Sequence, residues 1–216
     1  MIGDFFQRKQ TGEFTCGAAA LTVAIAEIGR APEENTDAVE ERIWRQVQGR
    51  DETWSVPGKL AHYAWKGGPG IRSAIWQDDG VIARTLAAVP RHLIGFDADA
   101  HLREHADALT RAEANGVEII HGAHGANTLT RLLDDGWRLL LVTILPSVLG
   151  LVLHYLLARY KSPDYGYAIM DPASGRNAPY GRHDLGNFLF GPAAELGGIS
   201  RYLGITVGVL DFPNVP

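Results

Sequence analysis

Residues 139–158 read LLLVTILPSVLGLVLHYLLA, and the fold of the chain depends on how this stretch is interpreted. It contains no formally charged side chain and is about as long as a membrane-spanning helix. Pro146, Ser147 and Gly150 interrupt its middle, and both flanks are of strand length and rich in branched or aromatic residues. His154 would also be costly in a lipid bilayer. We therefore expect two buried strands joined by a turn, and no stable membrane insertion.

Around this stretch, helical patterns dominate the earlier part of the chain and strand patterns dominate the later part. We expect helices over residues 16–28, 37–48, 57–65, about 80–88, about 98–114 and about 128–135. We expect strands at about 138–145, 151–159, 166–170 and 202–210. The glycine-rich WKGGPGIRS at residues 65–73 is interpreted as a loop, and VEII at 117–120 as a short apolar segment. Helices followed by strands predict an α+β fold with a C-terminal antiparallel sheet.

Composition limits the classes of partner. The chain has 216 residues, 46% of them hydrophobic and 21% charged, with a formal net charge of -5. This favours one domain over residues 1–216 and gives no electrostatic reason to expect nucleic acid or an anionic membrane as a partner. The single cysteine cannot form an internal disulfide. The first residues lack a secretory signal pattern, so we expect a cytoplasmic location, which is compatible with delivery by a specialised secretion system.

That cysteine, Cys16, lies at the start of an apolar helical run in QTGEFTCGAAALTVAIAEIG, residues 10–29. A thiol at a helix N-terminus is favoured as the thiolate, because free N–H groups and the helix dipole present partial positive charge there. We expect Gly17 to leave room for a substrate to approach the sulfur. Free cysteine is also among the most buried residue types, so inert packing of Cys16 in the core is the alternative.

A thiol nucleophile needs a base, usually a histidine, and the histidine needs an acceptor that fixes its tautomer. Of eight histidines, His154 is distinctive because an unpaired imidazole within an apolar strand would be costly. Asp171 ends another apolar stretch, in AIMDPASG at residues 168–175. A strand, a turn and a neighbouring strand would bring Asp171 beside His154.

Two other histidine pairs have spacings that a metal site could use. His101 and His105 are four residues apart, but DADAHLREHADALTR at residues 97–111 has the pattern of a solvated helix face. His121 and His124, in HGAHGA, form a similarly weak pair. We therefore expect neither a metal nor another cofactor.

Together these residues resemble the motif set of the papain-like cysteine peptidases that process bacteriocin leaders after a double glycine, and of their stand-alone relatives. Members of that family show Gln, five residues, Cys-Gly and a small-residue helix, which corresponds here to Gln10, TGEFT, Cys16, Gly17 and AAAL. They also have a His with an aromatic residue and a hydrophobic strand, and then an Asp-Pro-x-x-Gly turn. HYLLARY and DPASG match these two motifs, LTRLLDDGWRLLLVTI resembles the preceding helix and strand, and RHDLGNFLF is a candidate for a later aromatic helix.

The resemblance implies a papain-like fold whose central helix begins at the nucleophile. It implies that Cys16 is the nucleophile, His154 the general base and acid, and Asp171 the residue that orients the imidazole. Gln10 would be a side-chain donor to the oxyanion. The implied function is a cysteine peptidase or related hydrolase that cleaves an amide bond of a peptide or protein through an acyl-enzyme.

Two alternatives stay open. A thiol amidase, deamidase or acyltransferase, including a toxin-like effector, would use the same acyl-transfer chemistry. A catalytically silent papain-like domain would only bind peptides. Residues 66–125 are expected to be an insertion relative to compact leader peptidases, and the missing Gly-x-x-x-x-Gly-Lys motif argues against a bacteriocin exporter. The oligomeric state and the cleavage sequence are left open.

Overall fold

The computed structural model describes residues 5–29, 31–66, 70–88, 97–147, 150–162, 166–193, 196, 198 and 200–211. Its helices are α1 Cys16–Ile28, the short 3₁₀ helix η1 Pro32–Glu34, α2 Asp37–Val47, α3 Pro57–Lys66, α4 Asp79–Ala88, α5 Ala98–Ala114, α6 Ala126–Asp134 and α7 Arg182–Phe190. Its strands are β1 Ile71–Gln77, β2 Glu118–His121, β3 Arg138–Ser147, β4 Gly150–Ser162, β5 Gly166–Asp171, β6 Arg176–Tyr180 and β7 Tyr202–Asp211.

All seven of these strands belong to one sheet, in the order β2-β1-β7-β3-β4-β5-β6. The pair β1 and β2 is parallel, and every other neighbouring pair is antiparallel. The mixed α and β class and the antiparallel C-terminal strands predicted from the sequence are therefore confirmed.

The hydrophobic stretch 139–158 forms most of β3 and β4, as predicted. These strands pair antiparallel from Leu139 opposite Ala158 to Ser147 opposite Gly150. Both are central in the sheet, so their side chains are covered on both faces, which explains why the sequence is apolar without alternation. In the described part of the chain, no helix is both long enough and apolar enough to cross a membrane.

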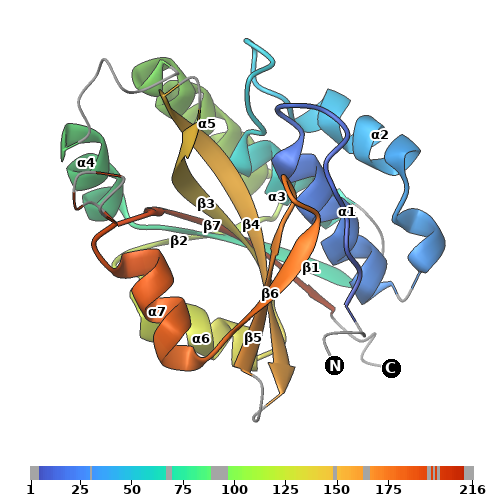
Figure 1. Cartoon of the computed structure of the whole chain (residues 1–216). Helices are drawn as coiled ribbons and strands as arrows, with labels where there is room; N and C mark the ends of the chain where they lie inside the picture. The colour runs from blue at the N-terminus through green and yellow to red at the C-terminus, as the bar shows by residue number, and fades with distance from the viewer. Residues whose placement is uncertain are drawn as a thin grey trace.

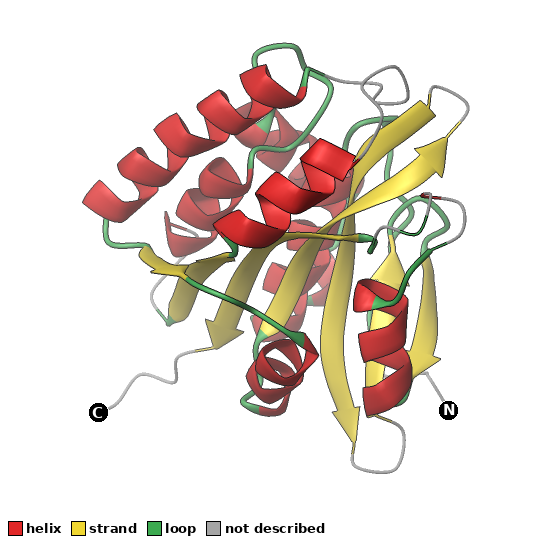
Figure 2. Cartoon of the chain, turned by 90° about the vertical axis from the view of Figure 1, so that its left-hand side faces the viewer, coloured by secondary structure: helices red, strands yellow, loops and turns green. Residues whose placement is uncertain are grey.

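Helices cover both faces of the sheet (Figures 1 and 2). Helices α1, α2, α3 and α5 contribute to a core on one face, which also contains Leu140 and Val142 of β3. Helices α6 and α7 pack on the opposite face with Leu139 and Leu141. Because successive strand side chains point to opposite faces, β3 contributes to both cores.

Helix α1 is the most buried of these helices, as its sequence predicts. Every residue of this helix is buried except Ile25 and Glu27, which are partly exposed. The helix contacts β3, β4 and β7 on one side and α2 and α3 on the other (Figure 1). Its first residue is Cys16, so the core fixes the position of the thiol.

The prediction that strands follow the helices was incomplete, because β1 and β2 occur earlier in the chain. Residues 71–73, predicted as loop, begin β1, which pairs with both β2 and β7. Ser73–Trp76 of this strand is buried at four successive positions, so the sequence lacks the alternation that marks a half-buried strand. Strand β6 was also missed, because it is a mostly exposed edge strand that contains Pro179.

Candidate active site

Cys16 lies at the N-terminus of α1 and is 6% exposed. The preceding residue, Thr15, is the N-cap, but its side chain makes no capping hydrogen bond to the helix. Its backbone carbonyl accepts the first regular helical bond, from the amide of Ala19 at 2.8 Å. The amide groups of the first turn, beside the sulfur, are thus not capped by the Thr15 hydroxyl.

His154 and Asp171 meet as predicted from their strands. His154 lies on β4 and is 8% exposed, and Asp171 is the last residue of the neighbouring strand β5. His154 Nε2 lies 2.8 Å from Asp171 Oδ1. The carboxylate is held by the turn that follows, because its Oδ1 also accepts the Ala173 amide at 2.9 Å. The imidazole is thereby oriented with its second ring nitrogen left for another partner.

The Cys16 thiol also acts on this imidazole, because its hydrogen-bonding and charge interactions with His154 raise the pKa of the ring. Burial acts to lower the pKa of His154, but hydrogen bonds and charges from Asp171 and Cys16 outweigh it and raise the pKa to about 10. Burial would raise the pKa of Asp171, yet the bond to His154 and the amide of Ala173 leave it lowered. The site therefore favours a protonated imidazole between the Asp171 carboxylate and the Cys16 side chain.

Tyr155 and Ser55 form the wall behind the thiol. Tyr155 is fully buried, and burial together with the nearby charge of Cys16 raises its pKa well above the ordinary value. Its hydroxyl donates to the Ser55 carbonyl at 2.7 Å. A Cβ on Gly17 would lie only 2.5 Å from Ser55 Cβ and 3.1 Å from Tyr155 Cδ2. The prediction that Gly17 leaves room for a substrate was therefore wrong, because Ser55 and Tyr155 fill the space that a side chain at this position would occupy.

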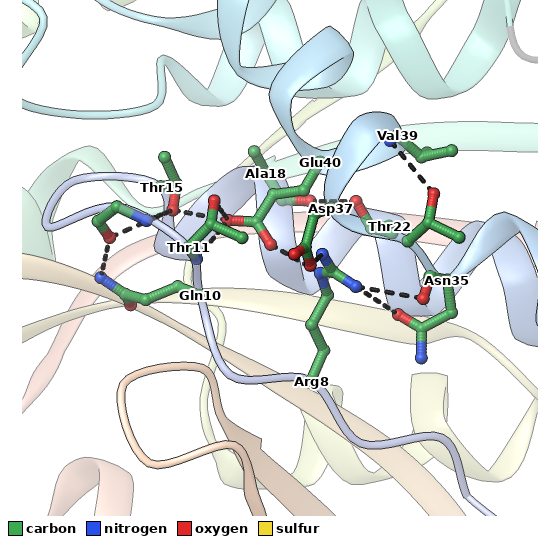
Figure 3. Close-up of polar contacts among 12 residues, drawn as sticks. Arg8, Gln10, Thr11, Thr15, Ala18, Thr22, Asn35, Asp37, Val39 and Glu40 are labelled. Carbon is green, nitrogen blue, oxygen red and sulfur yellow. Dashed lines mark hydrogen bonds and ion pairs between the residues drawn. The ribbon is translucent and has the colours of Figure 1, made fainter.

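Gln10 lies in the loop that leads to Cys16. Its amide nitrogen donates to the carbonyls of Gly12 at 2.7 Å and Glu13 at 2.8 Å, and its Oε1 is buried without a hydrogen-bond partner. Figure 3 shows this amide turned toward the loop. Its backbone amide also donates to Pro172 in the turn after Asp171, at 2.8 Å. Gln10 is thus joined to the Asp171 turn, but its side chain would have to rotate before it could donate to an oxyanion.

The paired histidines at residues 101 and 105 do not face one ligand. His101 Nε2 lies 3.1 Å from Asp51 Oδ2, and its ring packs edge-on against Trp54. His105 Nε2 lies 2.8 Å from Gln77 Oε1. Both are buried, which corrects the interpretation of a solvated helix face. Among the described residues there is no cluster of three or more His, Cys, Asp or Glu side chains that could hold a metal ion.

No protein-family model matches the chain, and a search of curated proteins finds no relative of it either. The arrangement of the site must therefore be judged by its own geometry. The structure brings Cys16, His154 and Asp171 together and places Gln10 in the adjoining loop. Sequence reasoning missed Ser55, and it included Tyr155 only as the aromatic residue of HYLLARY, because no motif connects residues that are in contact only through the fold.

Proposed function

We propose that the chain is a papain-like cysteine peptidase, or a closely related hydrolase, that cleaves an amide bond in a peptide or protein substrate. The observation that carries this proposal is the meeting of three side chains. Asp171 Oδ1 lies 2.8 Å from His154 Nε2, and Cys16, at the start of a buried helix, interacts with the same imidazole and raises its pKa. A cysteine that only packed in the core would need neither an imidazole partner nor a carboxylate behind it. The resemblance to the leader-processing family supports the same assignment of roles.

The reaction would begin with attack of the Cys16 thiolate on the substrate carbonyl carbon, which forms a carbon-sulfur bond. The carbonyl oxygen then carries negative charge. The protonated His154 gives its proton to the leaving nitrogen as the carbon-nitrogen bond breaks. Water, deprotonated by His154, then attacks the thioester and releases the acid and the thiol. Asp171 keeps the imidazole in the required orientation throughout.

The oxyanion would be stabilised by backbone amides of the first turn of α1, which Thr15 leaves uncapped. One such donor is typically worth about 2.7–4 kcal/mol in related chemistry. Gln10 is proposed as a second donor. In this structure its amide donates to Gly12 and Glu13, so substrate binding would have to break those two bonds.

The test is intact-protein mass spectrometry after incubation with a peptide carrying an electrophile at its C-terminus, between pH 5 and 9. We expect a single addition that is faster than the reaction of a model thiol near pH 6 and absent from Cys16→Ala. Labelling only above the ordinary thiol pKa of about 8.5, or only after unfolding, would show that Cys16 is a core residue. That result would also favour the peptide-binding alternative.

Hydrolysis, deamidation and acyl transfer share the acyl-enzyme, so they are distinguished by product. Peptide libraries incubated with the active protein would yield new termini from peptidase activity, a gain of one oxygen for the NH of a glutamine amide in deamidation, and a new amide or ester in acyl transfer. We expect new peptide termini, which are absent with Cys16→Ala.

A further inference from the structure

Glu40 is a fully buried carboxylate on α2, outside the candidate triad. Its Oε1 accepts three hydrogen bonds from the loop before the nucleophile. These come from the backbone amide of Thr11 at 2.8 Å, the Thr11 hydroxyl at 2.8 Å and the Thr15 hydroxyl at 2.6 Å. Figure 3 shows the carboxylate of Glu40 placed between this loop and α2. A buried carboxylate with so many donors from one loop fixes that loop strongly.

Arg8 supplies the charge that lets Glu40 stay buried as a carboxylate. Arg8 Nε lies 2.5 Å from Glu40 Oε2, and its side chain is only 6% exposed. The other guanidinium nitrogens bind Asp37 and the carbonyl of Asn35 (Figure 3). Arg8 thus offsets the charge of Glu40 inside the fold, and the ion pair holds the loop against α2.

The bond to Thr15 affects the first turn of α1. A threonine at the N-cap normally accepts a hydrogen bond from the second or third amide of its helix. Here its hydroxyl oxygen accepts a hydrogen bond from the Gly12 amide at 3.0 Å, and its one proton has two acceptors within reach, Glu40 Oε1 at 2.6 Å and the Gly12 carbonyl at 3.1 Å. The backbone of Thr15 is correspondingly not extended, with φ −88 and ψ 11. The hydroxyl is therefore turned away from the amides that lie beside Cys16.

We propose that Glu40 is a positioning residue for the thiol site. It holds the loop of residues 8–15 against α2 and keeps the Thr15 hydroxyl off the first turn of α1. The first-turn amides then remain available to an oxyanion that forms at Cys16, and the loop places Gln10 beside the same site. This proposal rests on the proposed function of Cys16, but the holding of the loop can be measured independently of any reaction.

The experiment compares two loop-releasing variants with two matched controls. Thr15→Val and Glu40→Gln remove the hydroxyl and the charge that connect the loop to α2. Thr22→Val is the control for the first, because Thr22 is a buried threonine of α1 whose hydroxyl donates to the Ala18 carbonyl in its own helix, at 2.8 Å. Glu27→Gln is the control for the second, because the Glu27 side chain also pairs with an arginine, Arg159, and is only 7% exposed. Among the described residues its hydrogen bonds come from Arg159 and the Phe6 amide, outside residues 8–15.

The first readout is the second-order rate of Cys16 labelling by the peptide electrophile, measured well below the melting temperature of every variant. We expect Thr15→Val and Glu40→Gln to lower this rate about tenfold or more, since small displacements of catalytic groups have effects of this size or larger. Thr22→Val and Glu27→Gln should label close to the parent rate. Thr15→Ser, which keeps the hydroxyl, should retain most of the parent labelling rate.

The second readout is amide hydrogen exchange of the peptide that covers residues 8–18, which we expect to become faster in Glu40→Gln. Loss of stability with unchanged labelling and unchanged exchange in this peptide would overturn the positioning role. If the parent Cys16 reacts no faster than a free thiol, the proposed function fails. In that case, hydrogen exchange that is equally fast in Glu40→Gln and the parent would also show that Glu40 does not hold the loop. Faster exchange in Glu40→Gln would show that Glu40 holds the loop, although Cys16 is not a nucleophile.

Discussion

Two buried histidines, one on strand β4 and one on helix α5, have pKa values that are shifted in opposite directions. His154 on β4 is 8% exposed, and His105 on α5 is 2% exposed. Each has Nε2 at 2.8 Å from a side-chain oxygen. Burial lowers the pKa of both, and for His105 this takes the pKa to about 4 despite the charge of Asp79. For His154, Asp171 and Cys16 reverse the effect and raise the pKa to about 10.

The difference lies in the partner and not in burial or distance. His105 faces the neutral amide of Gln77, which cannot offset the cost of burying an imidazolium. His154 lies between a carboxylate and a thiol, both of which can carry negative charge. A buried histidine is therefore evidence for chemistry only when charged partners surround it.

The largest effect that separates the two histidines should be on the reactivity of Cys16. We expect His154→Ala to lower the rate of labelling by the peptide electrophile about 10²-fold or more, because the Cys16 thiol loses the base that accepts its proton. His105→Ala removes an imidazole that is buried to a similar degree but should label close to the parent rate. Equal losses in both variants would mean that reactivity reports general stability and would contradict the assignment of His154.

A smaller effect should follow when the carboxylate beside each histidine is neutralised. Asp171→Asn should lower the pKa of His154 toward its ordinary value, because the charge and the hydrogen bond of Asp171 raise it. Asp79→Asn should lower the pKa of His105 below about 4, since Asp79 opposes the effect of burial there. Nuclear magnetic resonance titration of the imidazole ring protons measures both.

Each of these variants is the control for the other. Asp171→Asn should leave the pKa of His105 unchanged, and Asp79→Asn should leave that of His154 unchanged. We also expect Cys16 labelling to fall about tenfold in Asp171→Asn alone, since loss of an orienting partner typically costs 10–100-fold. A pKa of His154 that stays near 10 in Asp171→Asn would assign the shift to Cys16 instead.

The crowded wall of the thiol site provides the next test. Gly17→Ala places a methyl group against Ser55 and should lower the free energy of unfolding by about 1–3 kcal/mol, as overpacking of a core does. Gly125→Ala is the control, because nothing lies within 4 Å of a Cβ there and its φ of −86 suits alanine. Chemical denaturation measures both, and the double variant Gly17→Ala/Ser55→Gly should recover part of the loss. An unchanged free energy of unfolding in Gly17→Ala would contradict the tight contact.

The parts of the fold that could be predicted are those in which one short segment determines its own structure. Helix α1 begins at Cys16 as predicted, because a long apolar run can only be a buried helix or strand and small residues favour the helix. Pro146 is the second-last residue of β3 and Gly150 is the first residue of β4, so these two residues mark where one strand ends and the next begins. Strand β1 could not be recognised, since burial on both faces depends on what β2, β7 and the helices do.

The same limit applies to the candidate site. His154 and Asp171 could be paired because their strands are neighbours in sequence and in the sheet. The contact of Glu40 with Thr15 spans two helices, and neither residue belongs to a motif that points to the other. The orientation of the Gln10 amide is likewise decided by the carbonyls that the folded loop presents. Sequence patterns thus identify reactive groups more readily than the contacts that position them.

The last comparison of His154 with His105 concerns the pH dependence of stability, in which the two should act in opposite directions. Between pH 6.5 and about 10, folded His154 keeps a proton that the unfolded chain has lost, so its contribution to stability falls as pH rises. Between about 4 and 6.5, unfolded His105 binds a proton that the folded state excludes, so stability falls as pH falls. Urea unfolding across pH 4.5–9 measures both slopes. His154→Ala should flatten the alkaline side and His105→Ala the acidic side, each by at most about 1.4 kcal/mol per pH unit. An alkaline slope that is the same in His154→Ala and the parent would mean that the charged partners of His154 do not hold its proton in the folded state, and the distinction between the two histidines would be lost.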